Sequence, residues 1–236
     1  MFIDPIYLLL MIPALVLSLF ASWRTKSAFK KYSKVRTLNG MTGAQAAQVL
    51  LDRAGIDDVK VVPTRGYLSD HYNPLNKTLA LSEAVYGSPS VAAVGVACHE
   101  AGHAIQHAKR YAPLWVRSAL VPTANIGSKV GYFAMLGGLF LLYMGSTGLG
   151  QGVVLLGAVL FSAVLLFQIV TLPVEFDASA RAKRLAFEYG IVSGQERAGV
   201  AKVLNAAAMT YVAAAISTLM TLLYFLLRAG LLGGRR

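Results

Sequence analysis

Four long apolar runs dominate the pattern of hydrophobic and polar positions in this chain. They extend from Pro5 to Trp23, over roughly 120–144 with the most apolar part at 130–144, from Gln151 to Val174, and from Ala206 to Leu227. A helix needs about 20 apolar residues to cross the hydrocarbon core of a bilayer. The pattern therefore predicts an α-helical integral membrane protein with about four transmembrane segments.

The pattern changes between the first and second runs, where it is typical of a small α+β subdomain. Thr42 and Gln45 have the spacing of a capping box and Gly55 suits a helix end, so a helix is expected between them. Short apolar stretches at 58–63 and 78–81 favour strands.

A longer helix should follow these strands, while residues 67–74 are interpreted as a polar loop. Ser88 is the expected N-cap, with Pro89 at the first helical position, and the helix should extend to about Lys109.

The expected organisation has five segments. They are an N-terminal transmembrane anchor (1–23), a cytoplasmic α+β subdomain (24–117), a transmembrane hairpin (118–174), a cytoplasmic helical segment (175–205) and a C-terminal transmembrane or interfacial helix (206–236).

Charge supports this membrane interpretation and gives it a direction. Only 14% of residues are charged, against about 25% in ordinary soluble domains. Thirteen of the 22 Lys and Arg residues fall in 24–117 and five in 173–205, whereas the turn at 145–150 has none. Because basic residues mark the cytoplasmic side, these two segments should be cytoplasmic and the N-terminus outside. The net charge of +11 is thus explained by topology and contact with the lipid bilayer, and no nucleic-acid partner is expected.

The expected long helix carries the sequence His99-Glu100-Ala101-Gly102-His103, an H-E-x-x-H motif. Positions i and i+4 of a helix share a face, so both imidazoles can bind one metal ion. Glu100 lies beside them and is placed to act as general base on a metal-bound water. Cys98, the single cysteine, excludes an internal disulfide and is interpreted as a packed residue, since it lies about 100° around the helix from His99.

A catalytic zinc site requires a third protein ligand, and three candidates remain. A metzincin would place histidine ten residues after His99, but position 109 is lysine. Glu175 is favoured, because a carboxylate at the edge of an apolar run is costly without a partner. His107 is less suitable, because successive i+4 positions drift around the helix by about 40°. His71 is the remaining candidate.

Several of these residues have alternative roles. If His107 does not bind the metal, it is expected to support a ligand or to lie on the helix surface. His71 or its neighbour Tyr72 would stabilise the oxyanion of the reaction, or cap a turn. Asp177 is the nearest candidate to orient a ligating histidine through a hydrogen bond.

The sequence also resembles a known family, the YugP-like membrane zinc metallopeptidases of bacteria. The similarity is specific at His99–His107 (HEAGHAIQH) and at Glu175–Ser179 (EFDAS), and looser at 70–82 and 118–128. It implies a gluzincin-type site with His99, His103 and Glu175 on Zn²⁺ in a multi-pass protein of the bacterial plasma (inner) membrane. A more distant likeness links the chain to HtpX and the CAAX prenyl proteases, which place aspartate where this chain has Ser179.

These observations predict a membrane-embedded zinc endopeptidase that cleaves membrane or membrane-adjacent proteins, with its active site facing the cytoplasm. The alternatives are a non-catalytic membrane scaffold with a structural zinc site and a small transporter. Lys129 and Gln168 are the few polar groups in the spans that a transporter could use, and they form no evident pathway. The physiological substrate and oligomeric state stay open at this level.

Overall fold

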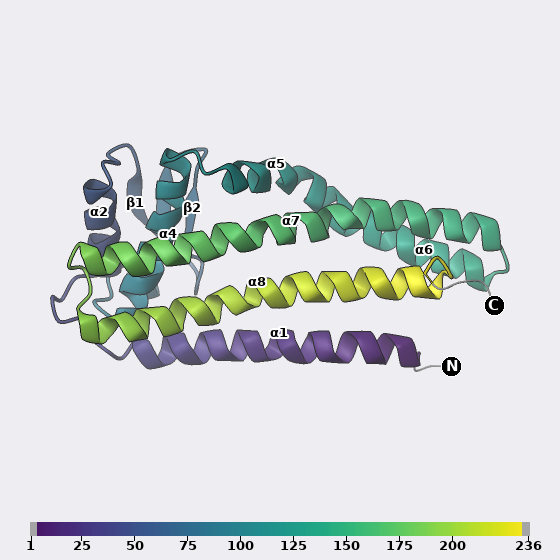
Figure 1. Ribbon diagram of the computed structural model, residues 1–236, viewed down its shortest axis with the longest axis horizontal. Helices are drawn as coiled ribbons and strands as arrows, with labels where there is room; N and C mark the ends of the chain where they lie inside the picture. The colour runs from purple at the N-terminus through teal and green to yellow at the C-terminus, as the bar shows by residue number, and fades with distance from the viewer. Residues whose placement is uncertain (1–3, 233–236) are drawn as a thin grey trace. The chain divides into compact units, whose positions relative to one another are not determined.

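The computed structural model describes residues 4–232, and most of them are helical (Figure 1). In chain order the elements are α1 (Pro5–Tyr32), α2 (Gly43–Arg53), β1 (Lys60–Thr64), β2 (His71–Asn73), β3 (Thr78–Ser82), α3 (Glu83–Tyr86), α4 (Val91–Ala108), α5 (Ala112–Ile126), the π-helical turn η1 (Gly127–Gly131), α6 (Tyr132–Tyr143), α7 (Thr147–Glu188) and α8 (Gly194–Arg228).

Four helical stretches in the described chain are long and apolar enough to cross a membrane. They are α1, the continuous stretch Ala112–Tyr143, α7 and α8. The prediction of a mostly helical chain with about four helices of membrane-spanning length is confirmed. Both α7 and α8 extend well beyond their apolar runs, so the expected division between 174 and 175 falls inside α7 (Figure 1).

The fold consists of two compact units that share the long helices. The first unit contains the beginning of α1, Trp115–Leu172 and the chain from Tyr211 onward. The second unit contains Ala21–Leu114 and Pro173–Thr210. The H-E-x-x-H motif and Glu175 therefore belong to the same unit.

A small mixed sheet forms part of the second unit. Its strand order is β1-β3-β2, with β3 parallel to β1 and antiparallel to β2. The expected strands at 58–63 and 78–81 agree with β1 and β3 within a few residues. The interpretation of 67–74 as a loop was wrong, because β2 lies within it. With three residues, β2 is too short to show alternation, and its pairing with β3 is a tertiary contact.

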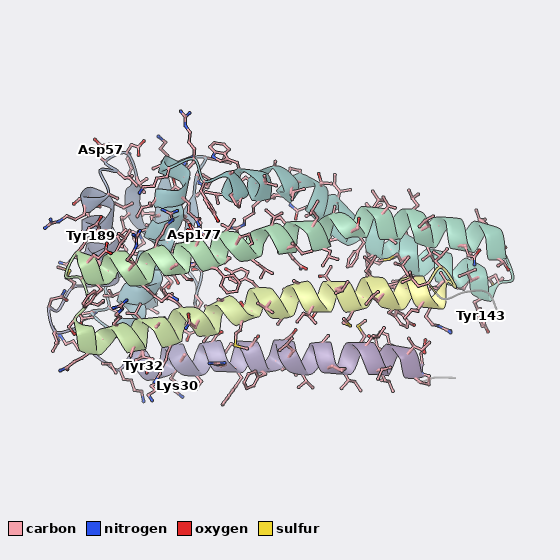
Figure 2. The ribbon with its side chains drawn as sticks, viewed as in Figure 1. Lys30, Tyr32, Asp57, Tyr143, Asp177 and Tyr189 are labelled. Atoms are coloured by element: carbon pink, nitrogen blue, oxygen red, sulfur yellow. The ribbon has the colours of Figure 1, made fainter. Side chains whose placement is uncertain are left out.

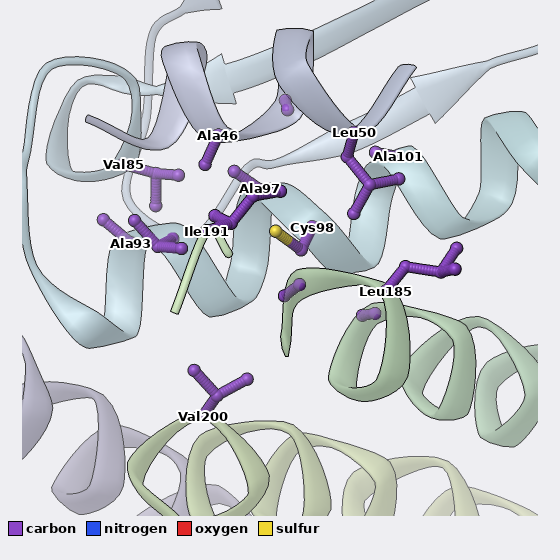
Figure 3. Close-up of a cluster of buried hydrophobic side chains, with 14 of the residues drawn as sticks. Ala46, Leu50, Val85, Ala93, Ala97, Cys98, Ala101, Leu185, Ile191 and Val200 are labelled. Carbon is purple, nitrogen blue, oxygen red and sulfur yellow. The ribbon is translucent and has the colours of Figure 1, made fainter. Parts of the chain in front are cut away.

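The core of the second unit surrounds α4 (Figure 3). Ala97, Cys98 and Ala101 of α4 are fully buried, as is Leu50 of α2, and Leu185 of α7 belongs to the same cluster. The many alanines and glycines of α4 leave little side-chain bulk, which lets neighbouring helices pack closely around it.

Side chains at the helix ends follow the sequence pattern with one exception. Both hydrogen bonds of the Thr42–Gln45 capping box are present, and Gly55 follows the end of α2 with a left-handed φ of 71°. The prediction that Ser88 caps α4 was wrong. Ser90 is the N-cap and accepts from the backbone N–H of Ala93; the chain is still extended at Ser90 (ψ 154°), so the helix begins two residues later than expected.

Candidate metal centre

The site is built where α4 and α7 approach each other closely within the second unit. A Cβ atom on Gly102 would lie 2.8 Å from the backbone oxygen of Ala178. Gly102 therefore allows a separation of the two backbones that any larger residue would prevent. On α7, Glu175 lies about one turn before Ala178, so it shares the face that meets α4.

Three potential ligands meet at this approach: His99, His103 and Glu175. Oε2 of Glu175 lies 3.2 Å from Nε2 of His99 and 3.6 Å from Nε2 of His103. One ligand atom from each residue lies within 4.8 Å of the others, so the group could hold a metal ion. The two rings are close to perpendicular, at an interplanar angle of 80°.

These spacings suit zinc. With ligand bonds of about 2.0–2.1 Å, tetrahedral geometry separates neighbouring ligand atoms by about 3.3 Å. The Glu175 oxygen and the two histidine nitrogens lie close to that separation. A set of two imidazoles and one carboxylate is also typical of catalytic zinc, which keeps a fourth position for water or substrate.

Each histidine directs Nε2 toward Glu175 and Nδ1 toward a separate partner. Nδ1 of His99 lies 3.1 Å from the hydroxyl oxygen of Ser179, one turn beyond Glu175 on α7. Nδ1 of His103 lies 2.9 Å from Oε1 of Gln106. Metal-binding histidines usually make such a bond through their second ring nitrogen, which fixes the ring.

Burial and charge act in opposite directions on His103. Burial alone would lower the pKa of this imidazole. The hydrogen bond and charge of Glu175, together with the charge of Glu100, raise the pKa by more than burial lowers it, so the net shift is upward. Glu175 is only 2% exposed and Glu100 only 8%. Two buried carboxylates therefore surround the imidazoles, and a cation at this position would offset their cost.

The structure separates His107 and His71 from this group. Nδ1 of His107 lies 2.8 Å from the hydroxyl of Tyr72 on β2, and the exposed His71 lies against the backbone oxygen of Ser69. Neither belongs to the group with His99, His103 and Glu175. Burial raises the pKa of Tyr72 to about 12, so its phenol stays protonated well above neutral pH.

Asp177 lies on α7 (Figure 2) and contacts Gln106, which in turn contacts His103. Its Oδ2 accepts from Nε2 of Gln106 at 2.8 Å and from Nε of Arg181 at 2.6 Å. Sequence reasoning assigned neither Gln106 nor Ser179 a contact with the histidines. Gln106 follows His103 by three residues on one helix and Ser179 follows Glu175 by four, so helical spacing was the available signal.

Comparison with known proteins gives two matches. A family model described as "Putative neutral zinc metallopeptidase" matches residues 7–230. The "Putative membrane protease YugP" of Bacillus subtilis (strain 168) is 46% identical over 222 residues, which are 94% of this chain and 96% of that protein. No solved structure matches the chain significantly.

Proposed function

This chain belongs to the family of putative neutral zinc metallopeptidases, and from this premise we propose that it is a membrane-embedded, zinc-dependent endopeptidase. Membership confirms the predicted family resemblance and zinc as the predicted cofactor. The proposed substrates are membrane proteins or proteins adjacent to the membrane. The observation that carries the proposal is the convergence of His99, His103 and Glu175 on one point in a buried setting.

In this proposal His99, His103 and Glu175 hold the zinc ion, as in a gluzincin. The support is the spacing of their ligand atoms and the hydrogen bonds that hold both imidazoles with Nε2 toward Glu175. Bound zinc would lower the pKa of a water ligand and polarise the substrate carbonyl.

Glu100 is the proposed general base. It follows His99 directly on α4, its charge acts on His103, and it is not one of the three clustered ligands. Its carboxylate would accept the proton of the attacking water and pass it to the leaving amine. Its low exposure keeps competing water away from that carboxylate.

The proposed location is the bacterial plasma (inner) membrane, with residues 24–117 and 175–205 on the cytoplasmic side. The support is the number of apolar helices, the printed name of the relative, which calls it a membrane protease, and the distribution of Lys and Arg.

Replacement of the base tests the enzymatic proposal. Glu100→Gln should retain zinc, because Glu100 is not a ligand, but should lower the cleavage rate of an unfolded fluorescent casein by about 10²–10⁴-fold, the usual contribution of a general base. Glu83→Gln on α3 is the matched control, since Glu83 is exposed and lies outside the site.

Two results would contradict the proposal. One is a folded, zinc-loaded Glu100→Gln protein that cleaves as fast as the wild type. The other is a zinc-loaded wild type that cleaves neither casein nor membrane-protein segments in vesicles, which would favour the structural scaffold.

A further inference from the structure

Gln106 is a fully buried polar residue on α4. Its side chain makes three hydrogen bonds. The amide Nε2 lies 2.8 Å from the backbone oxygen of Val174 and 2.8 Å from Oδ2 of Asp177, and Oε1 lies 2.9 Å from Nδ1 of His103. Every one of these partners lies in the second unit.

The chemistry of these partners leaves one orientation for the amide group. A backbone carbonyl only accepts, and a carboxylate only accepts, so the side of Gln106 that faces Val174 and Asp177 must be the NH₂ group. The Asp177 carboxylate is itself paired with the guanidinium of Arg181 at 2.6 Å. An amide flip would place two oxygens against the Gln106 oxygen and would leave both acceptors without this donor.

The fixed amide orientation determines which nitrogen of His103 donates. Because Oε1 of Gln106 has no hydrogen to donate, the bond between them requires a proton on Nδ1 of His103. In the neutral imidazole that metal binding requires, Nε2 is then the nitrogen whose lone pair is available, and it lies 3.6 Å from Oε2 of Glu175.

We propose that Gln106 is a positioning residue that holds His103 with its proton on Nδ1 and its Nε2 lone pair directed at the metal. Arg181 and Asp177 act behind it by fixing the Gln106 amide. This proposal rests on the zinc site of the proposed function. The corresponding bond of His99 is less selective, because the hydroxyl of Ser179 can donate or accept.

Two substitutions at Gln106 distinguish orientation of the histidine from simple packing. Gln106→Met keeps approximate shape but removes the acceptor. Gln106→Glu keeps an oxygen toward His103, whether ionised or protonated. If Gln106 orients His103, zinc affinity falls about 10–100-fold in Gln106→Met, as for other residues that support metal ligands, and falls less in Gln106→Glu. If Gln106 only fills space, the apolar Gln106→Met binds zinc as well as Gln106→Glu or better, and that order overturns the proposal.

The affinities are measured by competition with a chromophoric chelator on the full chain in mild detergent. Gln48→Met is the matched control and should leave zinc affinity unchanged. Gln48 lies exposed on α2, and its side-chain amide donates to Asp52.

A second measurement is made on the wild type, so it does not depend on whether a variant folds. In the zinc-loaded wild type labelled with ¹⁵N-histidine, His103 should bind zinc through Nε2 and show a slowly exchanging Nδ1–H resonance. Four histidines in the chain make assignment practical. Zinc bound through Nδ1 of His103, or an Nδ1–H that exchanges as fast as that of an exposed imidazole, overturns the proposal.

These results separate the positioning role from the zinc site itself. If the wild type binds no zinc, the proposed function fails and the role of Gln106 toward the metal falls with it. If the wild type binds zinc and Gln106→Met binds it as tightly as Gln106→Glu or more tightly, only the positioning role fails.

Discussion

Glu175 is the residue whose environment most restricts what this protein can do. Its carboxylate is 2% exposed, and an ionised group of this kind costs several kcal/mol to bury without compensation. The imidazoles of His99 and His103 meet it on the side facing α4. These three groups, of which His103 and Glu175 are buried and His99 is partly buried, are expensive to maintain as a purely structural feature and well suited to hold a dication.

At Cys98, which directly precedes the motif, burial favours the uncharged form of the side chain. Burial raises the pKa of the Cys98 thiol to about 12, against about 8.5 for a free thiol. The folded protein therefore retains a proton that the unfolded chain loses above about pH 8.5, and this group's contribution to stability is present below that pH and falls as pH rises toward 12.

We therefore expect Cys98 to resist alkylation in the folded protein. At pH 9 iodoacetamide should react with it only at the rate of local or global unfolding, because the thiolate is the reactive species. Mass spectrometry of the time course measures this rate, and protein denatured in SDS is the control. Folded protein that alkylates as fast as the denatured sample would contradict the burial of this thiol.

Among the elements, the pair α4 and α7 creates the site. Gly102 allows the close approach, and the face of α7 that meets α4 carries Glu175 and Ser179, which contact Nε2 and Nδ1 of His99 respectively. The site thus depends on helix separation as much as on ligand identity, since a shift of about 1 Å can cost 10²-fold in a catalytic arrangement.

Gly102→Ala tests this dependence on helix separation. The added methyl group would overlap the Ala178 backbone, so we expect a loss of about 1–3 kcal/mol in stability and weaker zinc binding, measured by thermal unfolding with and without zinc. Gly137→Ala on α6 is the control, because a Cβ there meets nothing within 4 Å. A Gly102→Ala protein as stable as the wild type, with unchanged zinc affinity, would show that the helices have room to separate.

Periodicity and capping signals predicted the long helices, the start of α2 and the strands β1 and β3, because these features depend on local sequence. The strand β2 was missed because its three residues become a strand only by pairing with β3. The convergence of His99, His103 and Glu175 was predictable from helical spacing and from the cost of an acid beside an apolar run. The contact of Gln106 with Asp177 was not predictable, because a neutral amide on α4 carries no sequence signal that points to a partner 71 positions away.

At the scale of the whole molecule, membrane topology decides which substrates can reach the site. The basic residues of 24–117 and 173–205 predict that both segments of the second unit are cytoplasmic, and the uncharged turn at 145–150 should lie outside. A zinc site assembled from both segments requires that they lie on the same side of the membrane.

Single-cysteine labelling in intact cells tests this topology. In a Cys98→Ala background, Ser146→Cys should react with a membrane-impermeant maleimide, whereas Leu75→Cys should react only after lysis. Both positions are exposed, and Leu75 is 95% exposed, so accessibility within the fold does not limit labelling. Reaction of Leu75→Cys in intact cells would reverse the proposed orientation.

The most direct test of the central claim is the zinc content of the full chain, purified in mild detergent without a metal-affinity tag. Elemental analysis should find about one zinc per chain in the wild type, as a three-ligand catalytic site requires. Glu175→Ala should contain almost none while remaining helical by circular dichroism. A folded wild type that neither contains zinc nor takes it up, or a Glu175→Ala protein that retains a full equivalent, would contradict the proposed site.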